Sequence, residues 1–294
     1  MLYPEDAPAG QARAGVFRHE LEKLGWVVGH NLQLDFFWGV GDAQWARSTA
    51  AQLLRLSPDV ILANGTRTLE PLREASRTTP IIFIGPSDPV AQGFVQSLAH
   101  PGGNITGFVG LEPSLGGKFL GLLKEIAPRL KRVAILFNPE VSGNRPFVDS
   151  ATNAAPALAV DLLVAPIHQP ADVEPAIARF EREPDCGLLI PPDTQMTAQR
   201  KLIIGLAARY RLPAIYAFRA ATEDGGLISY GVDILDLFQK AAGYADRILR
   251  GENPGDLPVQ QPTKFELAVN LSTAKSLGLE VSPALLAAAD EVIE

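Results

Sequence analysis

The feature of this 294-residue chain that most constrains its fold is the alternation of short apolar runs with segments of helical periodicity. The runs are continuously apolar rather than alternating, which is typical of strands covered by helices on both faces. Between them, apolar residues recur every three or four positions, as on one buried face of a helix. Strands that alternate with helices form βαβ units, so the pattern predicts an α/β fold with parallel sheets. The expected strands span 59–63, 81–84, 132–137, 161–164, 187–190 and 214–217.

A faint internal duplication indicates two lobes. PDVILANGT at 58–66 resembles PDCGLLIPPD at 184–193, and each is followed by a helical segment and then by a proline-led strand. We interpret the two pieces as equivalent parts of two lobes, and the chain length allows about two domains. The alternative is coincidence, because such runs are common in α/β proteins.

Three segments have the character of crossings between lobes. Residues 100–108 are glycine-rich and then extended, and 225–233 and 260–270 are further candidates. Three crossings would build each lobe from non-contiguous segments. We expect lobe 1 to contain 1–106 and 232–262, lobe 2 to contain 107–231, and 263–294 to form a C-terminal crossing and return to the first lobe.

Polar residues follow the first expected strand, at the edge where open parallel sheets bind ligands. These residues are Asn64, Gly65 and Thr66. Pro71 is tolerated only near the first turn of a helix, so the next helix should begin at 66–68. The free N–H groups of such an end attract a carboxylate or phosphate. The alternative is that Thr66 simply caps the helix.

Other strand ends add hydroxyl, amide and carboxylate groups. After the second strand, Ser87 offers a hydroxyl, and Asp88 either accepts from an ammonium group or serves as a turn residue. In the second lobe, Asn138 follows the strand at 132–137, and Asp193 follows the strand at 187–190. Asp193 fits the N-cap of the following helix equally well.

Two tyrosines complete the set of candidate binding residues. Tyr216 lies in the strand at 214–217, and Tyr230 lies in the segment LISYG. Tyrosines in such positions are more often core residues with a satisfied hydroxyl. Together with the polar groups, they suit a small zwitterion or polyol in a mostly dry cleft.

Charge and motifs weigh against several other classes of protein. A net charge of −7 argues against nucleic-acid binding, and no apolar run is long enough to span a bilayer. Cys186 is the single cysteine, so an internal disulfide and a two-cysteine racemase are both excluded. The four histidines lack metal-ligand spacing, and Gly116-Gly117-Lys118 lies inside a helical pattern rather than a phosphate-binding loop. We therefore expect no catalytic residues, no metal and no cofactor.

The most specific signal is a resemblance carried by PIIFIGPSDPVAQGFVQSLAHPGGNITGF at 80–108. This string resembles the signature of ABC-transporter substrate-binding proteins of the tryptophan/tyrosine-type periplasmic component family. The resemblance extends over nearly the whole chain. It is also carried by PDVILANGT, LGGKFLGLLKEIAP, RVAILFNP, RLPAIYAFR, GGLISYGVDI, the segment AAGYADRILRGENPGDLPVQQPTKFELAVNLSTAKSLGL and the closing DEVIE.

The resemblance implies a type I periplasmic-binding-protein fold, with two Rossmann-like lobes joined by three hinge crossings. It also implies a ligand in the cleft and its delivery to the membrane permease of an ABC importer. Characterised members of the family bind aromatic amino acids. The binding positions that it implies are those selected from the strand ends: Asn64, Gly65, Thr66, Ser87, Asp88, Asn138, Asp193, Tyr216 and Tyr230.

One departure from the family concerns the start of the chain. Family members begin with a leader and a first strand, whereas here only Met1-Leu2-Tyr3 stands where that strand should end. We therefore expect a first lobe without its central strand in this sequence. The resemblance implies a periplasmic location, and the missing leader leaves a cytoplasmic one as the alternative.

The leading hypothesis is capture of an amino acid or similar carboxylate by hinge closure. The helix ends after Asn64 and near Ser87 would bind the carboxylate, Asp88 or Asp193 would bind an ammonium group, and the tyrosines would cover the apolar part. The expected partners are the small molecule and a permease, and the protein is expected to be a monomer that binds no nucleic acid. The alternatives are a cytosolic ligand-sensing domain of the same fold and an enzyme of the open α/β class.

Overall fold

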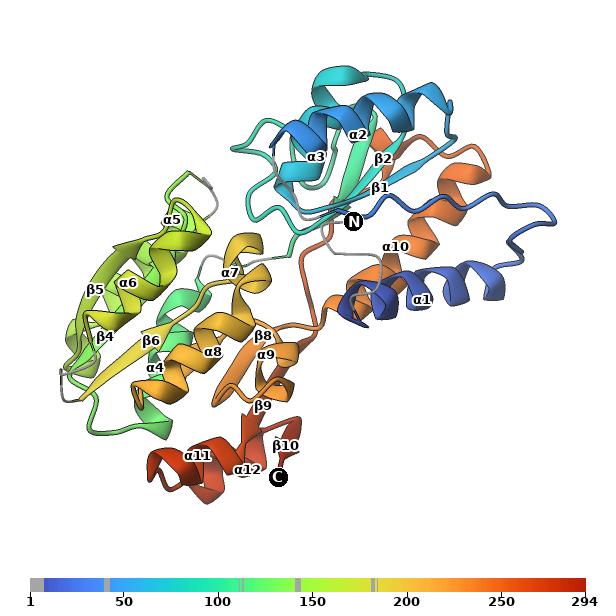
Figure 1. The fold of residues 1–294 in the computed structure, drawn as a ribbon. Helices are drawn as coiled ribbons and strands as arrows, with labels where there is room; N and C mark the ends of the chain where they lie inside the picture. Colours follow the sequence, from blue (N-terminus) through green and yellow to red (C-terminus); the bar gives the residue numbers. More distant parts are fainter. Residues whose placement is uncertain are drawn as a thin grey trace. The chain divides into compact units, whose positions relative to one another are not determined.

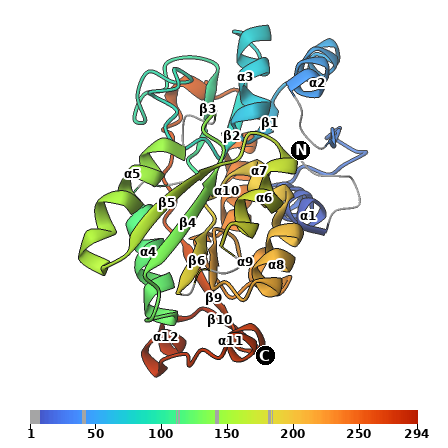
Figure 2. The ribbon, with the colours of Figure 1, turned by 60° about the vertical axis from the view of Figure 1, so that its left-hand side comes forward.

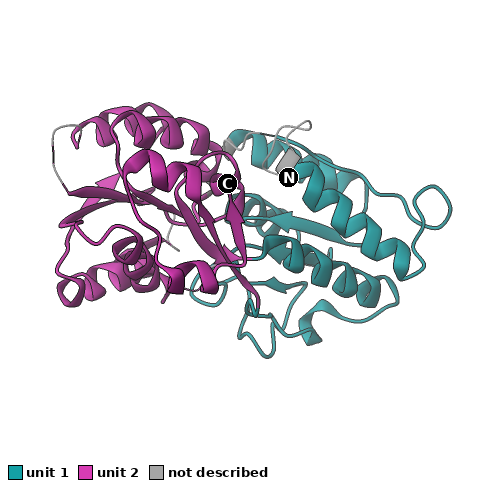
Figure 3. Ribbon diagram, turned by 90° about the horizontal axis from the view of Figure 1, so that it is seen from below, with its two compact units in different colours: residues 1–110, 233–263 teal, residues 111–232, 264–294 magenta. Residues whose placement is uncertain are grey.

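The chain forms two compact units, each built from segments that are not contiguous in sequence. The computed structural model describes residues 8–39, 43–110, 112, 114–140, 144–180, 183 and 185–294. Unit 1 comprises residues 1–110 and 233–263, and unit 2 comprises residues 111–232 and 264–294 (Figure 3). The chain thus passes from one unit to the other three times. The predicted α/β class, with mostly parallel sheets, is confirmed.

Unit 1 contains a parallel sheet of three strands among its described residues. The order is β1 (Ile61–Asn64), β2 (Ile81–Ile84) and β3 (Ile105–Phe108), and every residue of β2 and β3 is buried. Figure 1 shows helices on both sides of this sheet, as its continuous apolar strands require. These helices are α1 (Pro8–Lys23), α2 (Ala43–Arg55), α3 (Thr66–Ala75) and α10 (Ile234–Leu249).

Helix α10 belongs to unit 1 although it follows the second crossing. The Tyr244 ring packs on Phe108 of β3 with 4.8 Å between ring centroids, and its hydroxyl donates to the Pro258 carbonyl at 2.6 Å. Trp26 Nε1 donates to Asp246 at 2.8 Å, which joins the loop after α1 to α10. The residues Met1-Leu2-Tyr3, where the resemblance would end a first strand, lie outside the described residues.

Unit 2 contains a seven-stranded sheet in the order β10-β9-β8-β7-β6-β4-β5. All neighbouring strands are parallel except β8 and β9. The strands are β4 (Arg132–Phe137), β5 (Asp161–Pro166), β6 (Cys186–Leu189), β7 (Ala214–Tyr216), β8 (Ile228–Val232), β9 (Phe265–Asn270) and β10 (Glu291–Ile293). The helices are α4 (Leu115–Ile126), α5 (Asn144–Ala154), α6 (Val173–Ala178), α7 (Thr194–Ala198), α8 (Arg200–Arg209), α9 (Arg219–Glu223), α11 (Leu271–Leu277) and α12 (Pro283–Ala288). Short 3₁₀ turns span Pro156–Leu158 and Pro170–Asp172 in unit 2 and Pro254–Asp256 in unit 1.

Strand β4, which pairs with β5 on one side and β6 on the other, shows why unit 2 needs helices on both faces. Val133 and Ile135 belong to one buried cluster, with residues of α4 and α5, whereas Ala134 and Leu136 belong to a second cluster, with residues of α6 and α8. Figure 2 shows these two pairs of helices on opposite faces of the sheet. The edge strand β5 differs from the prediction of full burial, because Val164 is 52% exposed.

The C-terminal segment differs from the expectation that it returns to the first lobe. It lies in unit 2 instead, where β9 extends the sheet antiparallel to β8 and β10 pairs parallel with β9. Burial explains the difference, since Leu267 and Val269 enter the cluster that also contains α4 and α5. Asn270 then caps α11 by accepting a hydrogen bond from the Thr273 N–H at 2.8 Å.

Glycines allow α4 and α5 to pack closely in unit 2. A Cβ on Gly116 would overlap the backbone oxygen of Phe147, and a Cβ on Gly117 would lie 3.1 Å from that of Ala154. Residues 116–118 thus lie within α4, as predicted, and Gly116 serves helix packing.

We predict that Gly116→Ala lowers the free energy of unfolding by about 1–3 kcal/mol, because the overlapped atom is backbone and cannot rotate away. Gly121→Ala is the matched control, since it lies in the same helix and a Cβ there meets nothing within 4 Å. This control should be neutral or stabilising by up to about 1 kcal/mol. Urea denaturation of both variants measures the difference, and equal midpoints would contradict the packing role of Gly116.

Candidate ligand-binding site

In unit 1, glycines bring the ends of the three strands close together. Gly65 and Gly85 follow β1 and β2 with φ of 90° and 120°, values that favour glycine. Gly65 N donates to the Ile84 carbonyl at 2.7 Å, and Gly85 N donates to the Phe108 carbonyl at 3.0 Å. A Cβ on Gly110 would lie 2.6 Å from the Gly85 Cα. The loops after β1 and β2 therefore adjoin one another at the carboxyl edge of the sheet.

Helix α3 begins at Thr66, within the predicted range, and Gly65 is its N-cap. No side chain caps this end, and the first turn contains no acidic residue. The hydroxyl of Thr68 is directed back to the Asn64 and Gly65 carbonyls at 2.9 and 2.8 Å, which fixes the loop against the helix. The positive end of the helix dipole is therefore not neutralised by a side chain of its own helix, a condition that favours an anion.

Ser87 and Asp88 lie in the loop after β2. Ser87 is half-buried and Asp88 is exposed. One carboxylate oxygen of Asp88 accepts from the Ala91 N–H at 2.9 Å, and the Asp88 carbonyl accepts from the Gln92 N–H at 3.0 Å. Asp88 is thus a turn residue, as the sequence allowed, on the same edge of the sheet as Gly65.

In unit 2, Asp193 is the centre of a buried hydrogen-bond network. It is 2% exposed and caps α7, with Oδ1 accepting from the N–H groups of Gln195 at 2.7 Å and Met196 at 3.1 Å. Its Oδ2 accepts from Asn144 Nδ2 at 2.5 Å and more weakly from Asn138 N at 3.4 Å. Both carboxylate oxygens of Asp193 therefore accept hydrogen bonds from the protein itself, so the structure favours the capping role over ammonium binding.

The network joins Asn138 and Asp193, which the sequence predicted as site residues, to two residues that it did not predict. Asn138 is fully buried and follows β4, as predicted. Its side chain donates to Gln195 Oε1 at 2.8 Å, and its carbonyl accepts from Asn144 Nδ2 at 3.1 Å. Asn144 and Gln195 were missed, although each stands in the first turn of a helix that follows a strand. That position is the signal that could have identified them.

The two candidate tyrosines lie in different environments. Tyr216 is 2% exposed within the cluster that contains α6 and α8, and burial raises the pKa of its phenol far above the ordinary range. Tyr230 is half-buried. Its ring stacks on that of Phe265 with 5.9 Å between ring centroids and meets the Phe119 ring edge-on with 6.1 Å between centroids. Burial also raises the pKa of Tyr230. Tyr216 is therefore a core residue in this structure, whereas Tyr230 keeps a partly exposed ring.

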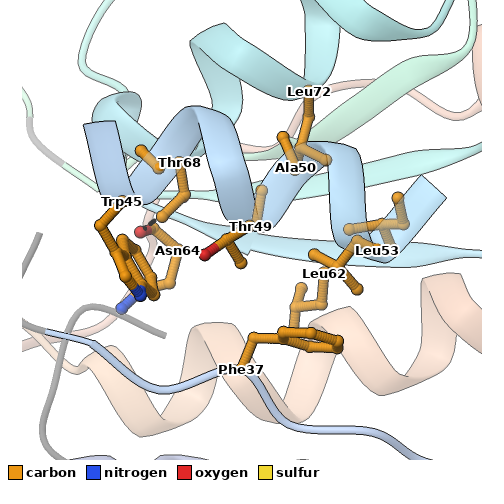
Figure 4. A pocket seen from close by; sticks show the side chains of 12 residues that line it. Phe37, Trp45, Thr49, Ala50, Leu53, Leu62, Asn64, Thr68 and Leu72 are labelled. Atoms are coloured by element: carbon orange, nitrogen blue, oxygen red, sulfur yellow. Dashed lines mark hydrogen bonds between the residues drawn. The ribbon is translucent and has the colours of Figure 1, made fainter. Parts of the chain in front are cut away.

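A small pocket adjoins the predicted loop in unit 1 (Figure 4). It lies beside β1, and Figure 4 shows Asn64 and Thr68 at one end, near Trp45, with Phe37 and Leu62 at the other. Its remaining lining is apolar apart from Thr49, and no charged side chain of the described residues lines it. The pocket therefore suits an apolar group rather than a carboxylate or an ammonium group.

The described part of the chain contains no group of three His, Cys, Asp or Glu side chains that could hold a metal ion. None of the helices in this part is long and apolar enough to cross a membrane. Cys186 is buried, and its burial raises the pKa of the thiol, as expected for an inert core residue.

The chain forms two α/β units with covered sheets and passes between them three times, and polar groups stand at the strand ends. These features define a ligand-binding protein of the type I periplasmic-binding-protein fold. The chain matches the family of ABC transporter substrate binding proteins over residues 6–293 and belongs to this family. The resemblance identified from the sequence is therefore confirmed. Proteins of this family typically act outside the cytoplasm and serve a membrane permease.

Individual relatives agree with this assignment. A "Tyrosine-binding protein" of Clostridioides difficile (strain R20291) is 27% identical over 267 residues, which cover 90% of this chain and 76% of the relative. A conserved domain protein from Vibrio cholerae O1 biovar eltor has a TM-score of 0.90 at 28% identity, covering 98% of this chain and 96% of that one. A domain from Streptococcus pneumonia in complex with L-Trp also has a TM-score of 0.90, at 21% identity and with 97% and 96% covered, a similarity of fold.

We predict that Asp193→Ala lowers the free energy of unfolding by about 2–4 kcal/mol, because it removes a helix cap and leaves buried amide donors without an acceptor. Asp88→Ala is the control, because Asp88 is exposed and accepts one hydrogen bond in a turn. Its effect should be about 1 kcal/mol or less. Urea denaturation without ligand measures both, and equal losses would refute the central role of Asp193.

Proposed function

We propose that this protein binds an aromatic L-amino acid, tyrosine or tryptophan, and delivers it to the permease of an ABC importer. The observation that carries the proposal is the helix end at Gly65 and Thr66, which no side chain caps and which lies at the carboxyl edge of a parallel sheet. Such an end is suited to the carboxylate that every amino acid carries. The relatives support the choice of side chain, since one is a tyrosine-binding protein and another was solved with L-Trp.

Each predicted residue has a proposed part in binding. The backbone N–H of Thr66 and the Ser87 hydroxyl bind the carboxylate, while Asn64 and Gly65 shape this loop, the Gly65 N–H being held by the Ile84 carbonyl. Asp88 takes the ammonium group, because it is exposed whereas Asp193 is engaged by the cap and by Asn144. In unit 2, Asn138 and Asp193 hold the loops after β4 and β6, and Tyr230 offers a partly exposed ring. Tyr216 supports these loops from within the core.

The family supports a proposal for the setting of this function. We propose a periplasmic location, a monomer in solution, and no catalytic turnover of the bound amino acid. Binding in the periplasm suits a protein that collects a solute for a membrane permease. Closure about the three crossings, expected from the resemblance, stays a prediction.

Isothermal titration calorimetry with L-tyrosine and L-tryptophan tests the proposal directly. We expect a Kd well below about 1 mM, which corresponds to a binding free energy stronger than about −4 kcal/mol. Tyramine and tryptamine, which lack the carboxylate, should bind at least about tenfold more weakly if a charge-assisted hydrogen bond is lost. A ligand at 100 times its Kd should also stabilise the protein by about 2.7 kcal/mol against urea. Absence of heat and of stabilisation with every aromatic amino acid would reject the proposal.

A point variant tests the loop after β2. Ser87→Ala should weaken L-tyrosine binding by about three- to tenfold, because a hydroxyl hydrogen bond contributes about 0.5–1.5 kcal/mol. Ser97→Ala is the control, since Ser97 lies in the same unit and its hydroxyl donates to the His100 carbonyl at 3.1 Å, away from the strand ends. Its Kd should equal that of the unaltered protein. The same Kd for Ser87→Ala would remove Ser87 from the site.

A further inference from the structure

The buried hydrogen-bond network of unit 2 determines which end of the Gln195 side-chain amide remains available to bind another group. The N–H of Glu140 donates to Asn138 Oδ1 at 2.8 Å, so the opposite end of the Asn138 amide must be its NH₂ group. That NH₂ donates to Gln195 Oε1 at 2.8 Å. The orientation of Gln195 follows from this chain of contacts, and its Nε2 is the end that faces away from Asn138.

The Nε2 group of Gln195 is buried and has no hydrogen-bond partner among the described residues. Gln195 as a whole is only 9% exposed. A buried donor without an acceptor costs about 1–3 kcal/mol, and nearly all buried polar groups in folded proteins have a partner. A ligand with an acceptor atom would supply the hydrogen-bond partner that the described residues do not provide.

The position of Gln195 is that of a ligand-binding residue in an open parallel sheet. It stands in the first turn of α7, which follows β6, and it contacts Asn138, which follows the adjacent strand β4. The carboxyl ends of neighbouring parallel strands are where such sheets bind ligands. By contrast, the buried hydroxyl of Ser229, which also has no partner among the described residues, lies within β8 and has no such position.

We propose that Gln195 binds the ligand, with its side-chain NH₂ donating to an oxygen acceptor of the bound molecule. This inference rests on the proposed function and extends it to a residue of unit 2. Two groups of tyrosine carry an acceptor oxygen, the carboxylate and the phenol. Phenylalanine lacks the phenol, and tyramine lacks the carboxylate. A donor fixed in this way also disfavours a ligand N–H group at the same place, because two donors would face each other.

The experiment compares two variants of Gln195 with the unaltered protein, using L-tyrosine, L-phenylalanine and tyramine as probes in calorimetry. Gln195→Glu keeps the acceptor for Asn138 and removes the donor, whereas Gln195→Met removes both polar ends with little change in size. We expect each variant to weaken L-tyrosine binding at least about tenfold. The loss should vanish for the one probe that lacks the oxygen bound by Gln195, which identifies that oxygen.

Controls separate a binding role from a structural one. Ser229→Ala removes a buried hydroxyl that has no partner among the described residues and should leave every Kd unchanged. An equal loss for all three probes with the Gln195 variants would overturn the inference, because it would indicate a distorted site, and unchanged affinities would overturn it as well. If either variant fails to fold, the side-chain amide resonances of Gln195 in the unaltered protein decide, because they should shift on adding L-tyrosine and remain in place if the inference is wrong. Absence of binding of all three probes and of L-tryptophan to the unaltered protein would instead overturn the proposed function and this inference with it.

Discussion

Burial of the parallel sheets on both faces is the constraint on which the rest of the structure depends. In β4, successive side chains enter two different apolar clusters, so each face needs its own helices, and the parallel strands are joined by crossovers. In unit 2 the crossovers gather the carboxyl ends of β4 to β8 along one edge of the sheet. Polar residues that follow separate strands, such as Asn138 and Asp193, are thereby brought into contact. The site is a consequence of how the sheet is covered.

The two units hold these strand ends together by different means. Unit 1 uses the backbone: Gly65, Gly85 and Gly110 let the loops approach closely, and the end of α3 is left without a side-chain cap. Unit 2 uses side chains: Asp193 satisfies two backbone donors of α7 and binds the amide of Asn144. A buried carboxylate is tolerated here because each oxygen accepts more than one hydrogen bond. Unit 1 therefore presents backbone N–H groups, and unit 2 presents oriented amides.

The sequence predicted the fold well wherever strands are continuously apolar and central. The expected runs at 81–84 and 132–137 coincide with β2 and β4, and the others overlap their strands. The return of 263–294 was wrong because FELAVN gains its stability from pairing with β8, a contact between distant parts of the chain that no local pattern encodes. The role of Asp193 was left open for a related reason. A cap and an ammonium ligand require the same residue type, and only burial and partners distinguish them.

Gln195 was not predicted for the same reason: its role depends on its burial and its hydrogen-bond partners, which the sequence pattern does not show. A glutamine in the first turn of a helix has no distinctive spacing, and the same fold serves many ligands, so neither pattern nor fold assigns it a role. Its chemistry becomes defined only when Glu140 N orients Asn138 and Asn138 orients Gln195. Each step converts a group that could donate or accept into one with a fixed direction. Selection among ligands of similar shape requires such direction, because a fixed donor accepts an oxygen and rejects an N–H in the same position.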